Sequence, residues 1–173
     1  FAFGRSEVDD IAAETGELAN LATLENARGV YLYRTQGKRE VRFSTDAGER
    51  HDLHCSATGK AMLAYSPDSA LDDVIHTHGL TEYTENTITT RDDLEADLEA
   101  VRENQLALDL EEYEKGLRCI ASPILDEEDR AIGAISLSGP AMKFTGDYFH
   151  EELAEAVKSA ANVVSLNIPR AAE

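Results

Sequence analysis

The polar residues in the last third of the chain interrupt stretches that otherwise read as β-strands. Asp109 stands inside the apolar run from Leu106 to Leu110, where a carboxylate without a partner is costly to bury. Ser136 and Ser138 are two positions apart, so their side chains project from the same face of a predicted strand, and Cys119 belongs to the same predicted hairpin. Small hydroxyl donors and one acid over an apolar floor predict a pocket for a compact polar ligand. The alternative is that the serines face solvent and Asp109 ends a strand.

A second group of chemically active residues, His51, His54 and Cys55, precedes a predicted helix. Thiol and imidazole groups are zinc ligands, but the chain has neither a Cys-x-x-Cys nor a helical His-x-x-x-His pattern. A helix start can lower the pKa of a thiol, yet no oriented Cys–His–acid set is recognisable. We therefore predict no catalytic site, no metal and no cofactor. A thiol-based redox enzyme, or a metal or redox sensor that uses Cys55 and Cys119, is retained as the alternative function.

The segment from Thr58 to Lys60 resembles the end of a phosphate-binding loop, but the pattern fails. That loop requires glycine at position 54 and serine or threonine at position 61, where the chain has His54 and Ala61. Gly59 instead predicts close packing of a helix built from small residues.

The charge balance limits the possible partners. Sixteen Lys and Arg against 34 Asp and Glu leave a formal net charge of −18, which repels the phosphates of DNA and RNA. The acids are spread over every segment, as expected for a protein that stays hydrated in concentrated salt, so we predict a halophilic, haloarchaeal origin with an acidic surface. No apolar run is long enough to cross a membrane and no export leader opens the sequence, which predicts a cytoplasmic protein.

The elements that must position these residues follow from periodicity and capping signals. We expect helices over 6–19 (a capping box at Ser6 and Asp9), from Ser56, from Pro67 with Ser66 as cap to Gly79, from Thr90 with Asp93 in a capping box, and from Thr145. We expect strands at 29–35, 39–45, 106–110, 117–125 and 131–138. Helices combined with hairpins of this kind predict an α+β fold with an antiparallel sheet.

Four segments in order resemble the effector-binding domain of IclR-type transcriptional regulators. Residues 53–64 contain His-x-x-x-x-Gly-Lys-x-x-Leu-Ala, and residues 79–89, 109–124 and 131–140 follow at the family's spacing. The resemblance implies a GAF-like fold, a curved antiparallel sheet flanked by helices. It further implies that residues 1–28 form a connector helix from a missing N-terminal winged helix-turn-helix domain and that residues 29–173 form the effector-binding domain.

The same resemblance implies a function in transcription regulation rather than catalysis. A small organic-acid effector would modulate DNA binding by the missing domain, not by this segment, and the protein would form a homodimer or homotetramer. The implied ligand-binding residues are Phe43, Ala57, Thr58, Asp109, Cys119, Ser136 and Ser138. Smaller residues are common at the position of Thr58, so the resemblance does not carry over the identity of the effector. A further alternative is a domain that only oligomerises around a vestigial pocket.

Overall fold

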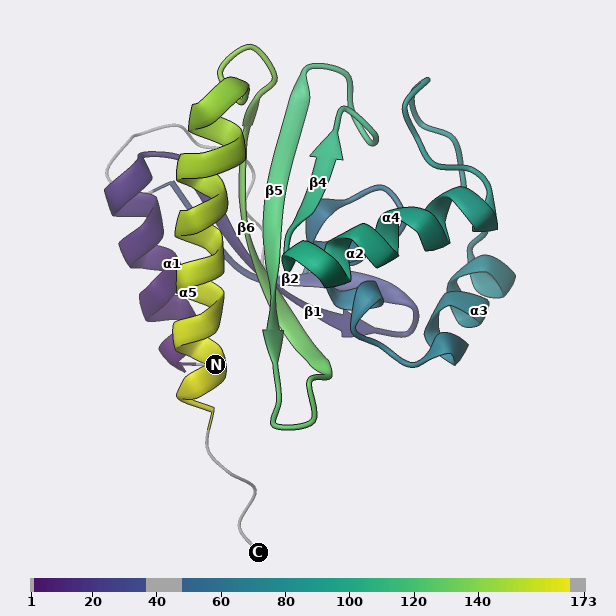
Figure 1. Ribbon diagram of the computed structural model, residues 1–173, viewed down its shortest axis with the longest axis horizontal. Coiled ribbons are helices and arrows are strands. Elements are labelled where there is room, and N and C mark those ends of the chain that lie inside the picture. Colours follow the sequence, from purple (N-terminus) through teal and green to yellow (C-terminus); the bar gives the residue numbers. More distant parts are fainter. Residues whose placement is uncertain (1, 37–47, 169–173) are drawn as a thin grey trace, which may run out of the picture.

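A six-stranded antiparallel sheet with strand order β3-β2-β1-β6-β5-β4 forms the centre of the computed structural model, which describes residues 2–36 and 48–168 (Figure 1). The strands are β1 (Leu18–Glu25), β2 (Arg28–Thr35), β3 (Arg50–His51), β4 (Ala107–Leu110), β5 (Leu117–Leu125) and β6 (Ala131–Pro140). The helices are α1 (Ala2–Thr15), α2 (Ala57–Ala64), α3 (Asp68–Thr77), α4 (Arg91–Asn104), the π-helical turn η1 (Tyr148–Leu153) and α5 (Ala154–Leu166). The predicted α+β fold, with a curved antiparallel sheet flanked by helices, is confirmed.

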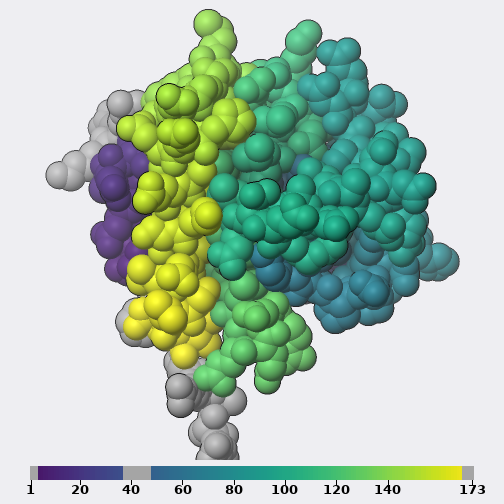
Figure 2. Space-filling model, viewed as in Figure 1, coloured from purple at the N-terminus to yellow at the C-terminus, as the bar shows by residue number. Residues whose placement is uncertain are grey.

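Successive side chains of each strand point to opposite faces of the sheet, and each face is covered by its own apolar layer. Leu21, Ile120 and Ile135 point toward α1 and α5, whereas Ala22 and Ala121 point toward α2 and α4. Figure 2 shows α5 beside α1 on one flank of the molecule and the segment α2–α4 on the other. The polar residues of the strands that share the second face therefore point toward α2.

The N-terminal part of the sheet differs from the sequence prediction. Leu18 and Ala19, predicted as the end of the opening helix, begin β1, the strand that joins β2 to β6. The preceding Gly16 adopts a positive φ of 72° and its N–H bonds to the carbonyl of Ala12, which ends α1 with a left-handed cap. The predicted capping box at Ser6 is wrong, because α1 begins at Ala2 and Ser6 lies inside it.

The predicted strand at 29–35 is confirmed as β2, which forms a hairpin with β1. Asn26 and Ala27 both have positive φ, 52° and 61°, and connect β1 to β2 by a two-residue turn. The predicted strand at 39–45 lies outside the described residues.

The later elements agree with the sequence except at one cap. Ser56 caps α2 by accepting from the N–H of Gly59, and Thr90 caps α4 by accepting from the N–H of Asp93. Ser66 does not cap α3, since its hydroxyl donates to the carbonyl of Met62 in the preceding helix. The close packing predicted at Gly59 is present, because a Cβ there would lie 2.5 Å from the Leu53 backbone.

The C-terminal helix predicted from Thr145 is divided into η1 and α5 and packs on β5. None of the helices in residues 2–36 and 48–168 is long and apolar enough to span a membrane.

Candidate functional site

A cavity of about 700 Å³ opens on the sheet face that carries α2. Its lining includes six residues that the sequence assigned to ligand binding, namely Ala57, Thr58, Asp109, Cys119, Ser136 and Ser138. The structure therefore brings together residues from one helix and three strands. Phe43, the remaining predicted residue, lies outside the described residues.

Strand register explains how residues so distant in sequence meet. Asp109 on β4 is paired with Cys119 on β5, which is paired in turn with Ser138 on β6. A second row runs from Ser136 on β6 through Asn20 on β1 to Arg34 on β2. Two polar rows thus cross the sheet under the cavity.

Asn20 is a residue of this site that the sequence analysis missed. Its side chain is completely buried, and its Nδ2 donates to the hydroxyl oxygens of Ser136 at 3.0 Å and Ser138 at 3.1 Å. The Cys119 thiol also donates to the Ser138 oxygen at 3.1 Å. The two serines are therefore held in place by hydrogen bonds from buried side chains and are not exposed to bulk solvent.

Arg34 places a positive charge at the same wall. Its Nε donates to Asn20 Oδ1 at 2.7 Å, its guanidinium lies 4.1 Å from the centre of the Tyr31 ring, and Nη1 contacts the Glu49 carboxylate at 3.3 Å. A guanidinium that stacks on an aromatic ring is well suited to contact an anion, because its planar group carries several N–H donors. Burial raises the pKa of the Tyr31 hydroxyl, so this group is neutral.

Asp109 supplies the acid of the cavity and is almost completely buried. Loss of hydration raises its pKa to about 7, although Oδ1 accepts a hydrogen bond from the Glu112 N–H at 2.8 Å, which acts in the opposite direction. Near neutral pH this carboxyl can therefore either donate or accept a hydrogen bond.

The start of α2 forms another part of the wall. The Thr58 hydroxyl lies 2.8 Å from Nε2 of His51, whose ring stacks on Tyr31 at 4.2 Å. Burial lowers the pKa of His51 to about 4, with a further decrease from Arg34, so the imidazole is neutral at pH 7. Within the described part of the chain, His51 Nδ1 is buried and has no hydrogen-bond partner.

The two cysteines do not have the environment of reactive thiols. Both are buried and free. Burial raises the pKa of Cys55 to about 12, and burial also raises the pKa of Cys119. A catalytic or redox-sensing cysteine needs a lowered pKa and solvent access, so these surroundings give no support to the thiol-based alternative.

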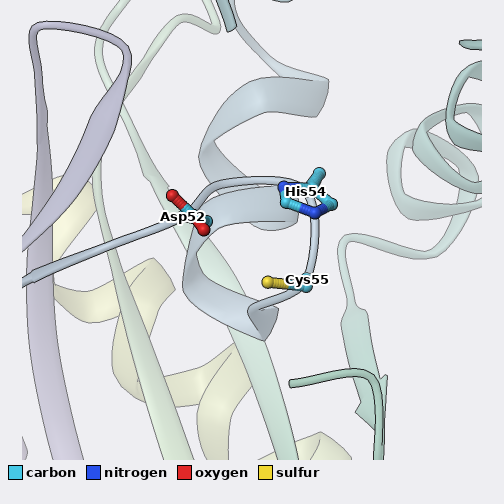
Figure 3. Close-up of side chains that lie close together, drawn as sticks. All are labelled: Asp52, His54 and Cys55. Atoms are coloured by element: carbon cyan, nitrogen blue, oxygen red, sulfur yellow. The ribbon is translucent and has the colours of Figure 1, made fainter. Parts of the chain in front are cut away.

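Asp52, His54 and Cys55 lie together on the loop between β3 and α2 (Figure 3), with potential ligand atoms within 4.8 Å of one another. Each polar group already has a protein contact or a high pKa: Asp52 accepts from the Tyr83 hydroxyl and pairs with Arg28, while His54 Nε2 lies 2.8 Å from the Thr81 carbonyl. These contacts tie the loop to the segment around Tyr83. His51, which the sequence grouped with these residues, contacts Thr58 instead.

Comparison with known proteins gives a consistent result. Residues 3–166 match the family model described as bacterial transcriptional regulator IclR C-terminal. The chain is 36% identical to the HTH-type transcriptional repressor AllR of Klebsiella pneumoniae over 151 residues, 87% of this chain and 55% of that protein. It is 33% identical to the transcriptional repressor IclR of Escherichia coli over 156 residues, 89% of this chain and 57% of that protein.

A solved structure agrees with these sequence matches. The Thermotoga maritima IclR crystal structure superposes with a TM-score of 0.87 at 32% identity, covering 95% of this chain and 66% of that one. The chain spans little more than half the length of the two curated relatives. From the family match over nearly its whole length, we conclude that this chain belongs to the IclR family of transcriptional regulators and corresponds to the family's C-terminal effector-binding domain.

Proposed function

We propose that the cavity binds a small organic acid as the effector of a transcriptional regulator. The observation that carries this proposal is the convergence of the Ser136 and Ser138 hydroxyls, the Asp109 carboxyl and the start of α2 on one cavity. The ligand carboxylate would lie between the serines and the α2 N-terminus. The N–H groups of Ala57 and Thr58 favour negative charge there, because the first N–H groups of a helix lack intrahelical partners.

Asp109 and Cys119 would contact the rest of the ligand. A carboxyl with a pKa of about 7 can donate to a carbonyl or accept from a hydroxyl. A hydroxy acid or keto acid of a few carbon atoms fits this arrangement. Phe43 remains part of the proposal as an apolar wall residue.

The complete protein would bind DNA through a winged helix-turn-helix domain that precedes this chain. Two supports are the repressor names of the relatives and their greater length. In this proposal α1, the helical part of residues 1–28, connects the two domains and packs on β1 and α5, whereas β1 belongs to the sheet of the effector-binding domain. Effector binding would shift the population between two arrangements of a homodimer or homotetramer, and α1 would transmit the shift.

A thermal-shift screen of small carboxylic acids in high salt tests the proposal, because a ligand that binds only the folded state raises the unfolding midpoint. The variants Ser138→Ala and Asp109→Ala should weaken the response to an active acid, whereas Ser159→Ala, an exposed serine of α5, should leave it intact. Unchanged affinity in both cavity variants would overturn the site. In the complete protein, both cavity variants should retain DNA binding and lose its response to the acid.

A further inference from the structure

The amide of Asn20 can have only one orientation in the buried row between Arg34 and the serines. A guanidinium has only donors, so the Asn20 atom 2.7 Å from Arg34 Nε must be the oxygen Oδ1. The NH₂ group consequently points to Ser136 and Ser138, and its two hydrogens are used at 3.0 Å and 3.1 Å. Arg34 on β2 thus determines which end of the Asn20 amide, on the neighbouring strand β1, faces the serines.

This orientation decides what the serines present to the cavity. Each hydroxyl oxygen accepts from Asn20, and the Ser138 oxygen accepts also from the Cys119 thiol. Over the described ranges 2–36 and 48–168, neither serine hydroxyl has a protein nitrogen or oxygen atom as acceptor for its own hydrogen, and the Cys119 sulfur beside Ser138 is only a weak acceptor. Both side chains are nevertheless buried and line the cavity. Two hydroxyl hydrogens are therefore left to donate to whatever occupies the cavity.

We infer that Asn20, oriented by Arg34, is a specificity-determining positioning residue that makes Ser136 and Ser138 obligate donors. This inference rests on the proposed function of the cavity. A carboxylate offers only acceptors and matches the pair. The amide of the same acid has a similar shape, but its NH₂ group would face a donor and remain unpaired. Two buried donors that face each other, or one that has no acceptor, lower affinity by roughly 10- to 100-fold. The two serine donors oriented by Asn20 therefore select acids over their amides.

Asn20→Asp tests this inference because it exchanges the donor for an acceptor at nearly constant shape. One carboxylate oxygen would keep the bond to Arg34 Nε, and the other would accept from the two serine hydroxyls. The serines would then turn their hydrogens away from the cavity and present lone pairs. The polarity of the wall would be reversed.

The experiment measures dissociation constants by calorimetry for three acids and their amides: lactate and lactamide, benzoate and benzamide, succinate and succinamide. The unsubstituted chain should bind at least one acid roughly tenfold or more tightly than its amide. Asn20→Asp should bind that acid at least about 100-fold more weakly and bind the amide more tightly than the unsubstituted chain does. Asn162→Asp makes the same chemical change on an exposed position of α5 and should alter neither constant.

The dissociation constants of the amides distinguish this inference from two simpler effects of the substitution. Added negative charge alone would weaken the acid and leave the amide unchanged, and a merely structural role of Asn20 would weaken both ligands by the same factor. Either result would overturn the inference while leaving the proposed function in place. Failure of the unsubstituted chain to bind any of the three acids would overturn the proposed function, and the inference with it.

Arg34→Met provides a second variant that does not place a charge in the interior. Without the Nε donor, the Asn20 amide is free to turn its oxygen toward the serines. The preference for the acid should fall by roughly tenfold or more, and the amide should bind more tightly. Loss of charge alone leaves the affinity for the neutral amide unchanged, and that outcome would contradict the inference even if Asn20→Asp does not fold.

Discussion

The Lys60 ammonium lies 2.9 Å from the Glu112 carboxylate, and the two side chains are only 2% and 7% exposed. Burial alone would lower the pKa of Lys60, but Glu112 and Asp97 outweigh it and raise the pKa, so the group is charged. The backbone N–H of Glu112 donates to Asp109, and Lys60 also donates to the Leu108 carbonyl. This ion pair therefore joins α2 to the strand end that carries the cavity acid.

Lys60→Met should destabilise the domain by about 3–5 kcal/mol, because it leaves the Glu112 carboxylate buried without its partner. The double variant Lys60→Met with Glu112→Gln should recover part of the loss, since the uncompensated charge is removed. Urea unfolding measures both. Lys158→Met, an exposed lysine of α5, should change the free energy of unfolding by less than about 0.5 kcal/mol. An equally small effect for Lys60→Met would contradict the structural role of this pair.

Asp109 should make the domain less stable as pH rises from about 4 to about 7. Its pKa is about 7 in the folded state against an ordinary value of 3.8. In that window the folded state keeps a proton that the unfolded state has lost, so the free energy of unfolding falls with increasing pH and levels off above pH 7. The total is on the order of 4 kcal/mol for a shift of this size.

Asp109→Asn should remove this part of the pH dependence. Its free energy of unfolding, compared with that of the unsubstituted chain, should therefore be most favourable above pH 7. Urea unfolding between pH 4 and pH 8 gives the comparison. The control Asp73→Asn, at an exposed position on α3, should preserve the slope of the unsubstituted chain. A slope that is the same in all three proteins would show that Asp109 titrates normally.

Both thiols should be unreactive in the folded protein. Burial holds the pKa of Cys55 at about 12 and raises that of Cys119, so neither provides thiolate at pH 8. A colorimetric disulfide reagent should modify neither cysteine within minutes in native buffer and both in urea. Rapid modification of native Cys55 would revive the thiol-based alternative.

The sequence predicted the part of the site that follows from local periodicity. Ser136 and Ser138 could be assigned to one face because strand side chains alternate with period two, and Asp109 was conspicuous in an apolar run. Asn20 and Arg34 could not be found in this way, because their role depends on the pairing of β1 with β2 and β6, which no local pattern specifies.

The error in β1 has a physical origin. Leucine and alanine are strong helix formers, so the sequence of β1 continues the composition of α1. Two signals favoured a boundary: Gly16, which ends the helix with a left-handed cap, and Asn26, which suits a tight hairpin turn. Tertiary pairing then determines the strand.

The net charge of −18 should make stability increase with salt. Screening shortens the Debye length from about 10 Å at 0.1 M to about 3 Å at 1 M, which weakens repulsion among the acids. The thermal midpoint should rise by roughly 5 °C or more between 0.1 M and 2 M KCl, equivalent to about 2 kcal/mol. Replacing the exposed Glu99, Glu103 and Glu155 by glutamine should reduce this dependence. No increase with salt would count against a halophilic adaptation.

A crystal structure of the domain with the most stabilising acid of the thermal-shift screen tests the proposed effector site most directly. The ligand carboxylate should lie within hydrogen-bonding distance of the Ser136 and Ser138 hydroxyls, with the remainder of the molecule directed toward Asp109. An acid bound at full occupancy outside this cavity, while the cavity contains only water, would contradict the proposed effector site.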